Sequence, residues 1–406
     1  MRMLLMLAAI GVAPVLYVLL KTISATAELT NWPKKWLRTG ALAIALWVAS
    51  YPLSAIVSYT FGLNSVWQAL QRPSPFVDAA MVYPFWIGII LAVQLAFLYL
   101  VIDGVRLAFF RVYRSHKQRW LKIQSWIVVS LACVAIVYGL SRVYFDTFTV
   151  RTREASLEVS DLPEELDGFR IVQIADLQAD PRTGERKIGP YVDRVNQLKP
   201  DIILFGGDLV TSGTEFIEQG AAAMGKMSAR RGVYACLGDH DHFSDKSLVI
   251  NSLQKHGVTI LDNLATVVPV GSTYVSLTGI TNVYRTRPTN GTLDGIERQR
   301  LQGPVDILLT HQPSPWLVSF AAERGYNLFL AGHTHGGQIA FPLPGFILTG
   351  SSFETNYVSG FYEVGSMLVS VNNGLGLTLA PLRYHAPAEV TLIVLKKRTA
   401  SVASNN

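Results

Sequence analysis

The stretch Asp201–Asp208, DIILFGGD, is an apolar run that ends abruptly in two glycines and an aspartate. A short continuous apolar run bounded by turn residues is typical of a strand that is buried on both faces. Glycine allows the sharp turn that would place Asp208 directly beyond the carboxyl end of this strand. An aspartate in such a position is often only a turn or cap residue, so one strand does not decide whether Asp208 binds a ligand.

Four further predicted strands end in the same way, in an aspartate or a histidine that usually lies beside glycine. These strands are residues 170–175, 232–237, 306–310 and 327–331, and the polar residues that follow them are Asp176, Asp239, His240, His311, His333 and His335. Residues 188–198 are predicted to form a helix, and residues 367–371 and 390–395 later strands. Sites in α/β sheets form beyond the carboxyl ends of strands. The sequence therefore predicts a layered α/β domain with a site at these strand ends.

The first part of the chain has a different composition, because four apolar runs there are long enough to cross a bilayer as helices of about 20 residues. They lie near residues 3–20, 40–61, 81–102 and 123–140. Four such runs in succession are poorly explained as buried core helices. The first run could be a signal peptide, but only Arg2 precedes it and no clear small-residue cleavage site follows, which favours a retained helix. We predict a membrane domain at residues 1–149, a soluble domain at 150–398 and a frayed tail at 399–406.

The distribution of charge separates the two parts. Residues 1–150 hold 13 Lys and Arg against 4 Asp and Glu, whereas residues 151–406 hold 22 against 25. The second part therefore lacks the basic clusters of nucleic-acid-binding domains, and no nucleic-acid partner is expected. The two cysteines, Cys133 and Cys236, cannot form a disulfide framework.

The basic residues between the apolar runs predict the orientation in the membrane. The first loop holds Lys21, Lys34, Lys35 and Arg38, the second only Arg72, and the third Arg106, Arg111, Arg114, Lys117, Arg119 and Lys122. No charge falls at the centre of a predicted helix, and Asp103 sits at a helix end. Because cytoplasmic loops are enriched in Lys and Arg, we expect loops one and three to be cytoplasmic. The chain would then be a multi-pass inner-membrane protein with its soluble domain on the extracytoplasmic side.

The strand-end residues combine carboxylate oxygens with imidazole nitrogens. This mixed set suits manganese, iron, zinc or cobalt. The candidate ligands outnumber what one ion needs, so two ions are expected. Two neighbouring ions can share a carboxylate and clamp the oxygens of a phosphoryl group.

Four sequence elements in this order resemble the calcineurin-like metallophosphoesterases. They are GGD at 206–208, GDHD at 238–241, the lone His311 and GHTHGGQ at 332–338. Within that superfamily the chain is similar to the membrane-associated bacterial branch that includes the YkuE and YaeI proteins. The resemblance covers about residues 155–395. It implies a four-layer α-β-β-α sandwich behind the transmembrane helices.

The resemblance also implies a role for each candidate residue. One ion would be held by Asp176 and His335, the other by Asp239, His311 and His333, with Asp208 bridging the two. His240 would meet the leaving-group oxygen or a phosphoryl oxygen as a catalytic acid, and Asp241 would orient it.

Two positions depart from the family pattern. Gln178 stands where the family has histidine, and Asp239 stands where it has asparagine. An amide oxygen is a harder and weaker ligand than imidazole, and a second carboxylate adds negative charge. We therefore expect Gln178 to bind the first ion weakly. Of the two divalent ions expected, manganese is the first choice, with magnesium, iron, zinc or cobalt as alternatives. His242 is a surface histidine on this interpretation, although it could replace the missing imidazole.

The leading function is that of a membrane-anchored, metal-dependent phosphoric ester hydrolase. The resemblance implies attack by a hydroxide held between the ions on a phosphodiester, phosphomonoester or pyrophosphate bond. The expected partners are the lipid bilayer and a phosphorylated small molecule or lipid, and the substrate is expected to be lipid-linked or part of the cell envelope. One alternative is a UDP-2,3-diacylglucosamine-type pyrophosphate hydrolase of lipid A synthesis, which needs a cytoplasmic site. The other is a non-catalytic metal-binding module on a membrane anchor, which the departure at Gln178 motivates.

Overall fold

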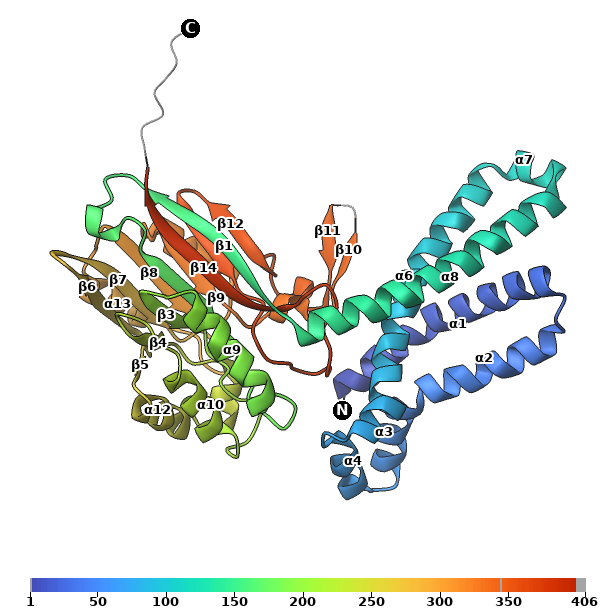
Figure 1. Cartoon of the computed structure of the whole chain (residues 1–406), viewed down its shortest axis with the longest axis horizontal. Coiled ribbons are helices and arrows are strands. Elements are labelled where there is room, and N and C mark those ends of the chain that lie inside the picture. The colour runs from blue at the N-terminus through green and yellow to red at the C-terminus, as the bar shows by residue number, and fades with distance from the viewer. Residues whose placement is uncertain (1, 344, 399–406) are drawn as a thin grey trace, which may run out of the picture. The chain divides into compact units, whose positions relative to one another are not determined.

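A computed structural model of the chain describes residues 2–343 and 345–398 (Figure 1). The chain divides into two compact units, Met1–Phe145 and Asp146–Asn406. The boundary predicted between residues 149 and 150 falls just after this division. The predicted tail at 399–406 lies outside the described residues.

The first unit is helical. Its elements are α1 (Arg2–Thr30), α2 (Lys34–Val48), α3 (Ser50–Thr60), α4 (Asn64–Gln71), α5 (Pro75–Val77), the π-helical η1 (Asp78–Val82), α6 (Tyr83–Ala108), α7 (Phe110–Ser115) and α8 (Lys117–Phe148). Three helical stretches of the described chain are long and apolar enough to cross a membrane: Gly11–Thr30, Pro75–Ala108 and Lys117–Phe148. Helices α2 and α3 bend by 58° at their junction and make a fourth if they count as one span. Each of the four predicted apolar runs overlaps one of these four places, although the first was predicted at residues 3–20 and the span lies at Gly11–Thr30.

The position of Lys21 differs from the sequence-based expectation. Helix α1 continues past the predicted end of its apolar run, so Lys21 is a helical residue and the prediction that it lies in a loop is wrong. Its ammonium group forms an ion pair with Asp103 of α6, and the Tyr17 hydroxyl donates to the same carboxylate at 2.6 Å. Pairing lowers the cost of keeping charges within apolar helices. The expectation that no charge falls at the centre of a membrane helix is also wrong, because Lys21 lies near the middle of the span Gly11–Thr30.

The second unit contains two six-stranded sheets. The first sheet has the order β1 (Val150–Val159), β14 (Ala388–Lys397), β2 (Arg170–Ile174), β3 (Ile202–Phe205), β4 (Val233–Ala235) and β5 (Val258–Ile260). Strands β2 to β5 are parallel to one another, whereas β14 runs antiparallel to β2. The register pairs Ile171 with Ile202 and Ile203 with Val233. All carboxyl ends of β2, β3 and β4 therefore meet at one edge.

The second sheet is also six-stranded and mostly parallel. Its order is β12 (Gly360–Val364), β13 (Met367–Val371), β9 (Leu328–Ala331), β8 (Val305–Thr310), β7 (Thr273–Ile280) and β6 (Leu264–Val270). The four inner strands are parallel, and the two edge strands, β12 and β6, are antiparallel to their neighbours. Strands buried on both faces are continuously apolar, as in β3, β8 and β9.

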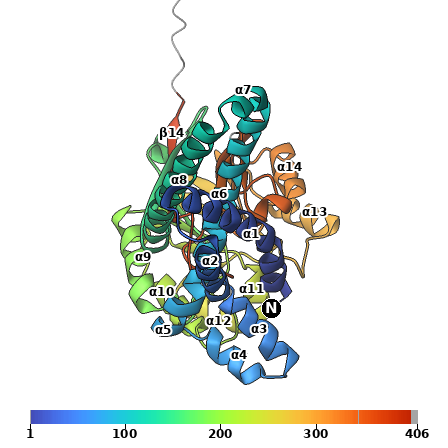
Figure 2. The same ribbon diagram turned by 90° about the vertical axis from the view of Figure 1, so that its right-hand side faces the viewer.

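Apolar side chains of both sheets pack together, and helices cover the outer faces. Ile171, Ile202 and Leu309 belong to the core between the sheets. The first sheet is covered by α9 (Glu185–Gln197), α10 (Ile217–Gly225) and α12 (Lys246–Lys255), and the second by α13 (Asn290–Gln299) and α14 (Pro315–Glu323). Figure 2 shows α9 and α10 on one side of the sheets and α13 and α14 on the other. The predicted α-β-β-α sandwich is confirmed.

Strand β1 was missed by the sequence pattern. The soluble domain was predicted to begin at residue 150, but no strand was predicted before residue 170, whereas β1 starts at Val150, just after α8 ends at Phe148. It pairs in parallel with β14, from Val150 opposite Ala388 onwards. The exposed positions of this edge strand carry charged residues, which conceal its apolar alternation.

Candidate metal centre

The candidate ligands come from the carboxyl ends of strands in both sheets. In the first sheet, Asp176 follows β2 and Asp208 follows β3, while Asp239 begins helix α11 (Asp239–Ser244) after β4. In the second sheet, His311 follows β8 and His333 follows β9. Because the strands are parallel within each sheet, the five residues reach one edge of the sandwich.

The backbone at this edge turns sharply. Asp176, Asp208 and His333 have φ values of 51°, 60° and 69°, a left-handed conformation that is uncommon outside glycine. A Cβ on Gly238 would lie 2.1 Å from the Asp208 carboxylate, and one on Gly332 would lie 2.5 Å from that of Asp176. Glycine at these two positions allows the loops to approach closely, and the strained turns aim the side chains at one point.

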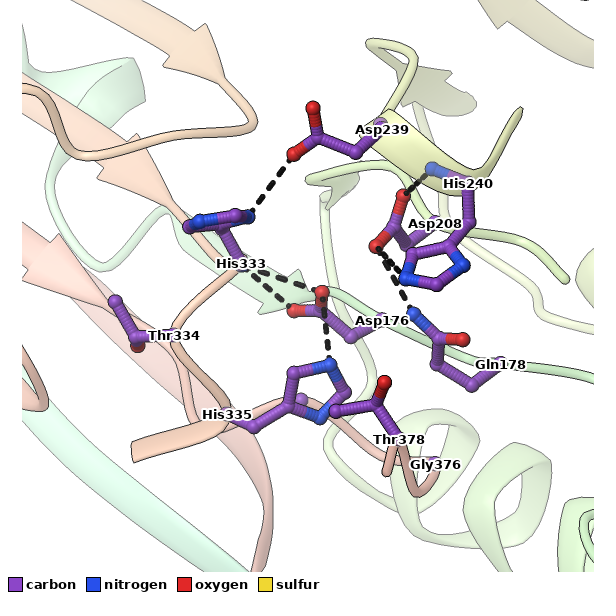
Figure 3. Close-up of polar contacts among 12 residues, drawn as sticks. Asp176, Gln178, Asp208, Asp239, His240, His333, Thr334, His335, Gly376 and Thr378 are labelled. Carbon is purple, nitrogen blue, oxygen red and sulfur yellow. Dashed lines mark hydrogen bonds and ion pairs between the residues drawn. The ribbon is translucent and has the colours of Figure 1, made fainter. Parts of the chain in front are cut away.

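The side chains form two overlapping groups. Ligand atoms of Asp239, His311 and His333 lie within 4.8 Å of one another, and so do those of Asp176, Asp208 and His311. Nε2 of His311 lies 3.3 Å from Asp208 Oδ2 and 3.4 Å from Asp239 Oδ2, which joins the groups. His333 Nδ1 lies 3.0 Å from Asp239 Oδ2 (Figure 3). The structure thus brings together five of the seven predicted ligands.

His335 lies beside these groups and outside both. Its Nε2 atom is 3.4 Å from Asp176 Oδ1, and its ring is buried. Burial, together with the charge of Arg383, holds the pKa of His335 well below its ordinary value. A neutral imidazole is the form that binds a metal ion, so His335 is ready to act as a ligand next to Asp176.

The residues present fit divalent cations. Three carboxylates, those of Asp176, Asp208 and Asp239, are buried at one place, which is costly without positive charge. Within the described part of the chain, His311 Nε2, His335 Nδ1 and Gln178 Oε1 are buried and have no hydrogen-bond partner. The Nδ1 atom of His311 lies 2.7 Å from the carbonyl oxygen of Gly206, which leaves Nε2 free to bind an ion.

The comparisons with known proteins agree with this geometry. The calcineurin-like phosphoesterase family matches residues 169–337, which hold all the candidate ligands. The metallophosphoesterase YkuE of Bacillus subtilis (strain 168) is 31% identical over 264 residues, which cover 64% of this chain and 90% of that protein. The chain belongs to the calcineurin-like phosphoesterases.

Two further relatives of this phosphoesterase bear on its organisation. A transmembrane protein with metallophosphoesterase domain from Danio rerio is 31% identical over 286 residues, covering 68% of this chain and 63% of that protein. The phosphodiesterase YaeI of Escherichia coli (strain K12) is 27% identical over 233 residues, covering 56% and 82%. With its apolar helices, the chain is a membrane protein that carries a metal-dependent phosphoesterase domain.

Gln178 reaches the site but binds a neighbouring residue of the phosphoesterase. Its Nε2 atom donates to Asp208 Oδ2 at 2.9 Å, and its Oε1 atom is the unpartnered one (Figure 3). The amide therefore uses the same carboxylate oxygen that lies near His311. A half-turn of the amide would exchange its donor and its acceptor. In the present orientation the NH2 group donates to Asp208, and in the other the oxygen could serve as the predicted metal ligand.

The prediction that Asp241 orients His240 is wrong. The Asp241 carboxylate accepts from the backbone amides of Gly238, Asp208 and Leu209 at 2.9, 2.9 and 2.8 Å. Both of its oxygens are occupied by backbone, so it holds together the loops after β3 and β4. Its pKa is raised to about 6 by burial and by the charge of Asp208.

His240 is oriented by backbone instead. Its Nδ1 atom lies 2.5 Å from the carbonyl oxygen of Thr211, and its amide donates to Asp208 Oδ1 at 2.8 Å. The ring is partly exposed, and its Nε2 atom lies 4.0 Å from Asp208 Oδ2. This nitrogen therefore borders the metal groups from the open side. His242, the possible replacement ligand, belongs to neither group of the described residues.

Sequence reasoning missed two residues at the mouth of the site. The Tyr284 hydroxyl donates to Glu354 Oε2 at 2.8 Å, and His333 Nε2 lies 3.2 Å from the same oxygen. The Tyr284 amide also donates to Asp239 Oδ1 at 2.6 Å. Both residues lie in loops and belong to no motif, so only the fold reveals them. A carboxylate on the outer nitrogen of a metal-binding histidine fixes the ring and its tautomer.

Removing this support should weaken metal binding. We expect Glu354→Ala to lower Mn²⁺ affinity by about tenfold, because His333 Nδ1 is then less firmly presented to the ion. Isothermal titration calorimetry on the full chain measures this, with Glu354→Ala compared with Glu363→Ala, a change at the exposed residue of edge strand β12. Equal affinities in both variants would contradict the assignment.

The protonation states of the site imply a pH dependence of metal binding. Burial and the charge of Asp208 raise the pKa of Asp176 to about 7. Burial disfavours the charged ring of His333, but hydrogen bonds to Asp239 and Glu354 outweigh it and raise the pKa to about 9. Burial is likewise outweighed at His311, where Asp208 holds the pKa well above its ordinary value. Each group thus retains a proton up to a higher pH than usual.

Because ligands must lose their protons to bind an ion, Mn²⁺ affinity should rise by more than about tenfold between roughly pH 6 and pH 9. The sign follows from the raised pKa values: affinity is low below them and full above them. Calorimetry in buffers of different ionisation enthalpy should show net proton release. Affinity that is flat over this range would contradict the assigned ligands.

Proposed function

We propose that this chain is a membrane-anchored phosphoesterase that hydrolyses a phosphodiester, phosphomonoester or pyrophosphate bond of a lipid-linked or envelope substrate. The observation that carries this proposal is the direct passage from α8 into the sheet whose strands lead to Asp176, Asp208 and Asp239. Only Thr149 separates the end of α8 from β1. A lipid is therefore the phosphorylated compound present at highest local concentration around the domain.

Two divalent ions would occupy the centre, manganese being the proposed metal. Asp176, Asp208 and His335 would hold one, and Asp239, His311 and His333 the other. Bound ions of this kind supply a nucleophilic hydroxide at neutral pH and neutralise charge on the phosphoryl oxygens. Asp208 lies in one group and contacts His311, which both groups share. Its buried charge is held by His311, which outweighs burial and lowers the pKa of Asp208.

His240 would donate the proton that the leaving oxygen needs. Its Nδ1 atom donates to the Thr211 carbonyl oxygen, which can only accept. The Nε2 atom therefore carries a proton only in the charged ring. Such an imidazolium at the open side of the site can protonate the departing alkoxide.

The experiment is hydrolysis by the full chain in lipid nanodiscs loaded with Mn²⁺. Substrates are bis(p-nitrophenyl) phosphate, p-nitrophenyl phosphate, a phospholipid and an isoprenyl pyrophosphate. The proposal expects faster turnover of at least one bilayer-borne substrate than of the soluble esters at equal concentration. Turnover of soluble esters alone would refute the lipid-linked substrate, and no turnover at all would favour the non-catalytic module.

The metal preference is tested at Gln178. An amide oxygen and the extra carboxylate of Asp239 favour a hard ion, so wild-type protein should retain Mn²⁺ in competition with Zn²⁺ better than Gln178→His does. Elemental mass spectrometry after dialysis against both metals measures the ratio. Zinc preference in the wild type, with unchanged affinity in Gln178→Ala, would remove the role given to Gln178.

An extracytoplasmic site is proposed from the loop charges. It separates the lead function from the lipid A hydrolase, which needs a cytoplasmic site. The exposed Leu301, changed to cysteine in a Cys133→Ser background, reports the side, because Cys236 is buried. Labelling of intact cells by an impermeant maleimide is expected. Labelling only after lysis would favour the lipid A hydrolase.

A further inference from the structure

A small hairpin beside the metal centre exposes large apolar side chains. Strands β10 (Phe341–Leu343) and β11 (Phe346–Leu348) pair antiparallel and are followed by the 3₁₀ turn η4 (Gly350–Phe353). The exposed fractions are 58% for Phe346, 47% for Ile347, 37% for Leu348 and 87% for Phe353. Figure 1 shows the hairpin standing apart from the two sheets. We call these four side chains the apolar tip; such a gathering on an exposed surface marks an interaction site.

The root of the hairpin connects to the last turn of α8. The rings of Phe341 and Tyr384 lie 5.7 Å apart, and the Ala340 amide donates to the Tyr384 carbonyl at 2.9 Å. The next residue back, Arg383, donates its amide to the Thr147 hydroxyl at 2.9 Å. Thr147 belongs to a helix that is long and apolar enough to cross a membrane. The hairpin is therefore linked, through Tyr384 and Arg383, to the carboxyl end of α8.

The foot of the hairpin connects to the metal-binding loop. Thr349 is buried, and its hydroxyl lies where a Cβ on Gly337 would come within 2.3 Å. The Ser351 hydroxyl donates to the Thr334 carbonyl at 3.1 Å. Glu354, which supports His333, follows η4 directly. A surface that holds the tip thus also fixes the distance between that surface and the metal centre.

We propose that the apolar tip docks into the lipid–water interface of the bilayer that holds α8, and so sets the metal centre at the level of lipid headgroups. This inference rests on the proposed function for its substrate, and on the hairpin alone for the docking. The transfer of aromatic and aliphatic side chains from water to this interface is favourable. The link between the hairpin root and the end of α8, a helix apolar enough to cross a membrane, argues for the bilayer as the occupant.

Depth-dependent fluorescence quenching tests the docking without using activity. The full chain, with Cys133→Ser and Ile347→Cys, is labelled with bimane and reconstituted into phosphatidylcholine vesicles containing doxyl-labelled lipid. The matched control is Leu301→Cys, which is 62% exposed and precedes the amino end of β8, away from the metal edge. We expect at least about threefold stronger quenching at position 347 than at 301. Equal quenching, or a label at 347 shielded by self-association of the chain, would overturn the proposal.

A second readout links docking to the substrate. The double variant Phe346→Ser/Ile347→Ser should lower the ratio of phospholipid to bis(p-nitrophenyl) phosphate hydrolysis about tenfold, since two apolar contacts with the bilayer are lost. Leu301→Ser should leave this ratio unchanged. Mn²⁺-dependent thermal stabilisation of the double variant verifies that the centre is intact. An unchanged ratio in a folded double variant would overturn the docking role. Strong quenching at position 347, together with no hydrolysis by the wild type, would support docking and contradict the proposed function.

Discussion

Asp208→Asn should lower the rate of phosphoester hydrolysis by at least about 10³-fold, equivalent to roughly 4 kcal/mol in the transition state. Asp208 is buried in the ligand group that it forms with Asp176 and His311, and it approaches His311, Gln178 and the backbone of His240. Asparagine keeps the shape but removes the charge that holds cations there. Steady-state kinetics with Mn²⁺ on the full chain measures the loss, and elemental analysis should show fewer ions per chain.

A matched control for this variant is the aspartate at the other end of strand β3. Asp201 lies at the opposite end of β3, where its carboxylate accepts from the Arg170 amide and pairs with Arg230. We expect Asp201→Asn to change stability and to leave metal content as in the wild type. Equal losses of activity in Asp208→Asn and Asp201→Asn at normal metal content would show that Asp208 has only a structural role.

The second large effect is expected at His240. His240→Ala should lower kcat by about 10²- to 10³-fold for an alkyl phosphoester and much less for a p-nitrophenyl ester, whose leaving group needs no proton. His240 borders the centre with its Nε2 atom, and its other nitrogen is fixed by Thr211. The comparison of the two substrates separates loss of a proton donor from general damage.

His242 provides the control for this prediction, because it lies on the same short helix but in neither ligand group of the described residues. His242→Ala should retain the wild-type ratio between the two esters. The assignment of His240 as the acid fails if His240→Ala slows both esters equally.

The strand ends could be predicted from the sequence because local patterns encode them. Apolar runs that stop at Asp or His beside glycine place Asp176, Asp208 and His311 correctly at the carboxyl ends of β2, β3 and β8. The chain reversals need positive φ or close backbone approach, which the glycines signal. The layer order followed from the resemblance and is borne out by the two sheets.

The remaining features depend on contacts between distant parts of the chain. Strand β1 is recognised only by its pairing with β14. Lys21 is compatible with an apolar helix only because Asp103 of another helix neutralises it. The direction of the Asp241 carboxylate is set by amides of Asp208 and Leu209, which no local pattern reveals.

Tyr284 and Glu354 illustrate the same limit at the site itself. Each stands in a loop without periodicity: Tyr284 follows β7 and Glu354 follows η4, and the two meet only because the fold brings these loops together. Motifs therefore locate groups that bind the ion, whereas the groups that support those ligands emerge from the fold.

The most direct test of the central claim is the metal content of the full chain after reconstitution with Mn²⁺, measured by elemental mass spectrometry against protein concentration. The two ligand groups predict two ions per chain, with loss of ions in Asp208→Asn and retention in Asp201→Asn. A folded wild-type chain that binds no Mn²⁺, or binds it equally well without Asp208, would contradict the metal centre described above.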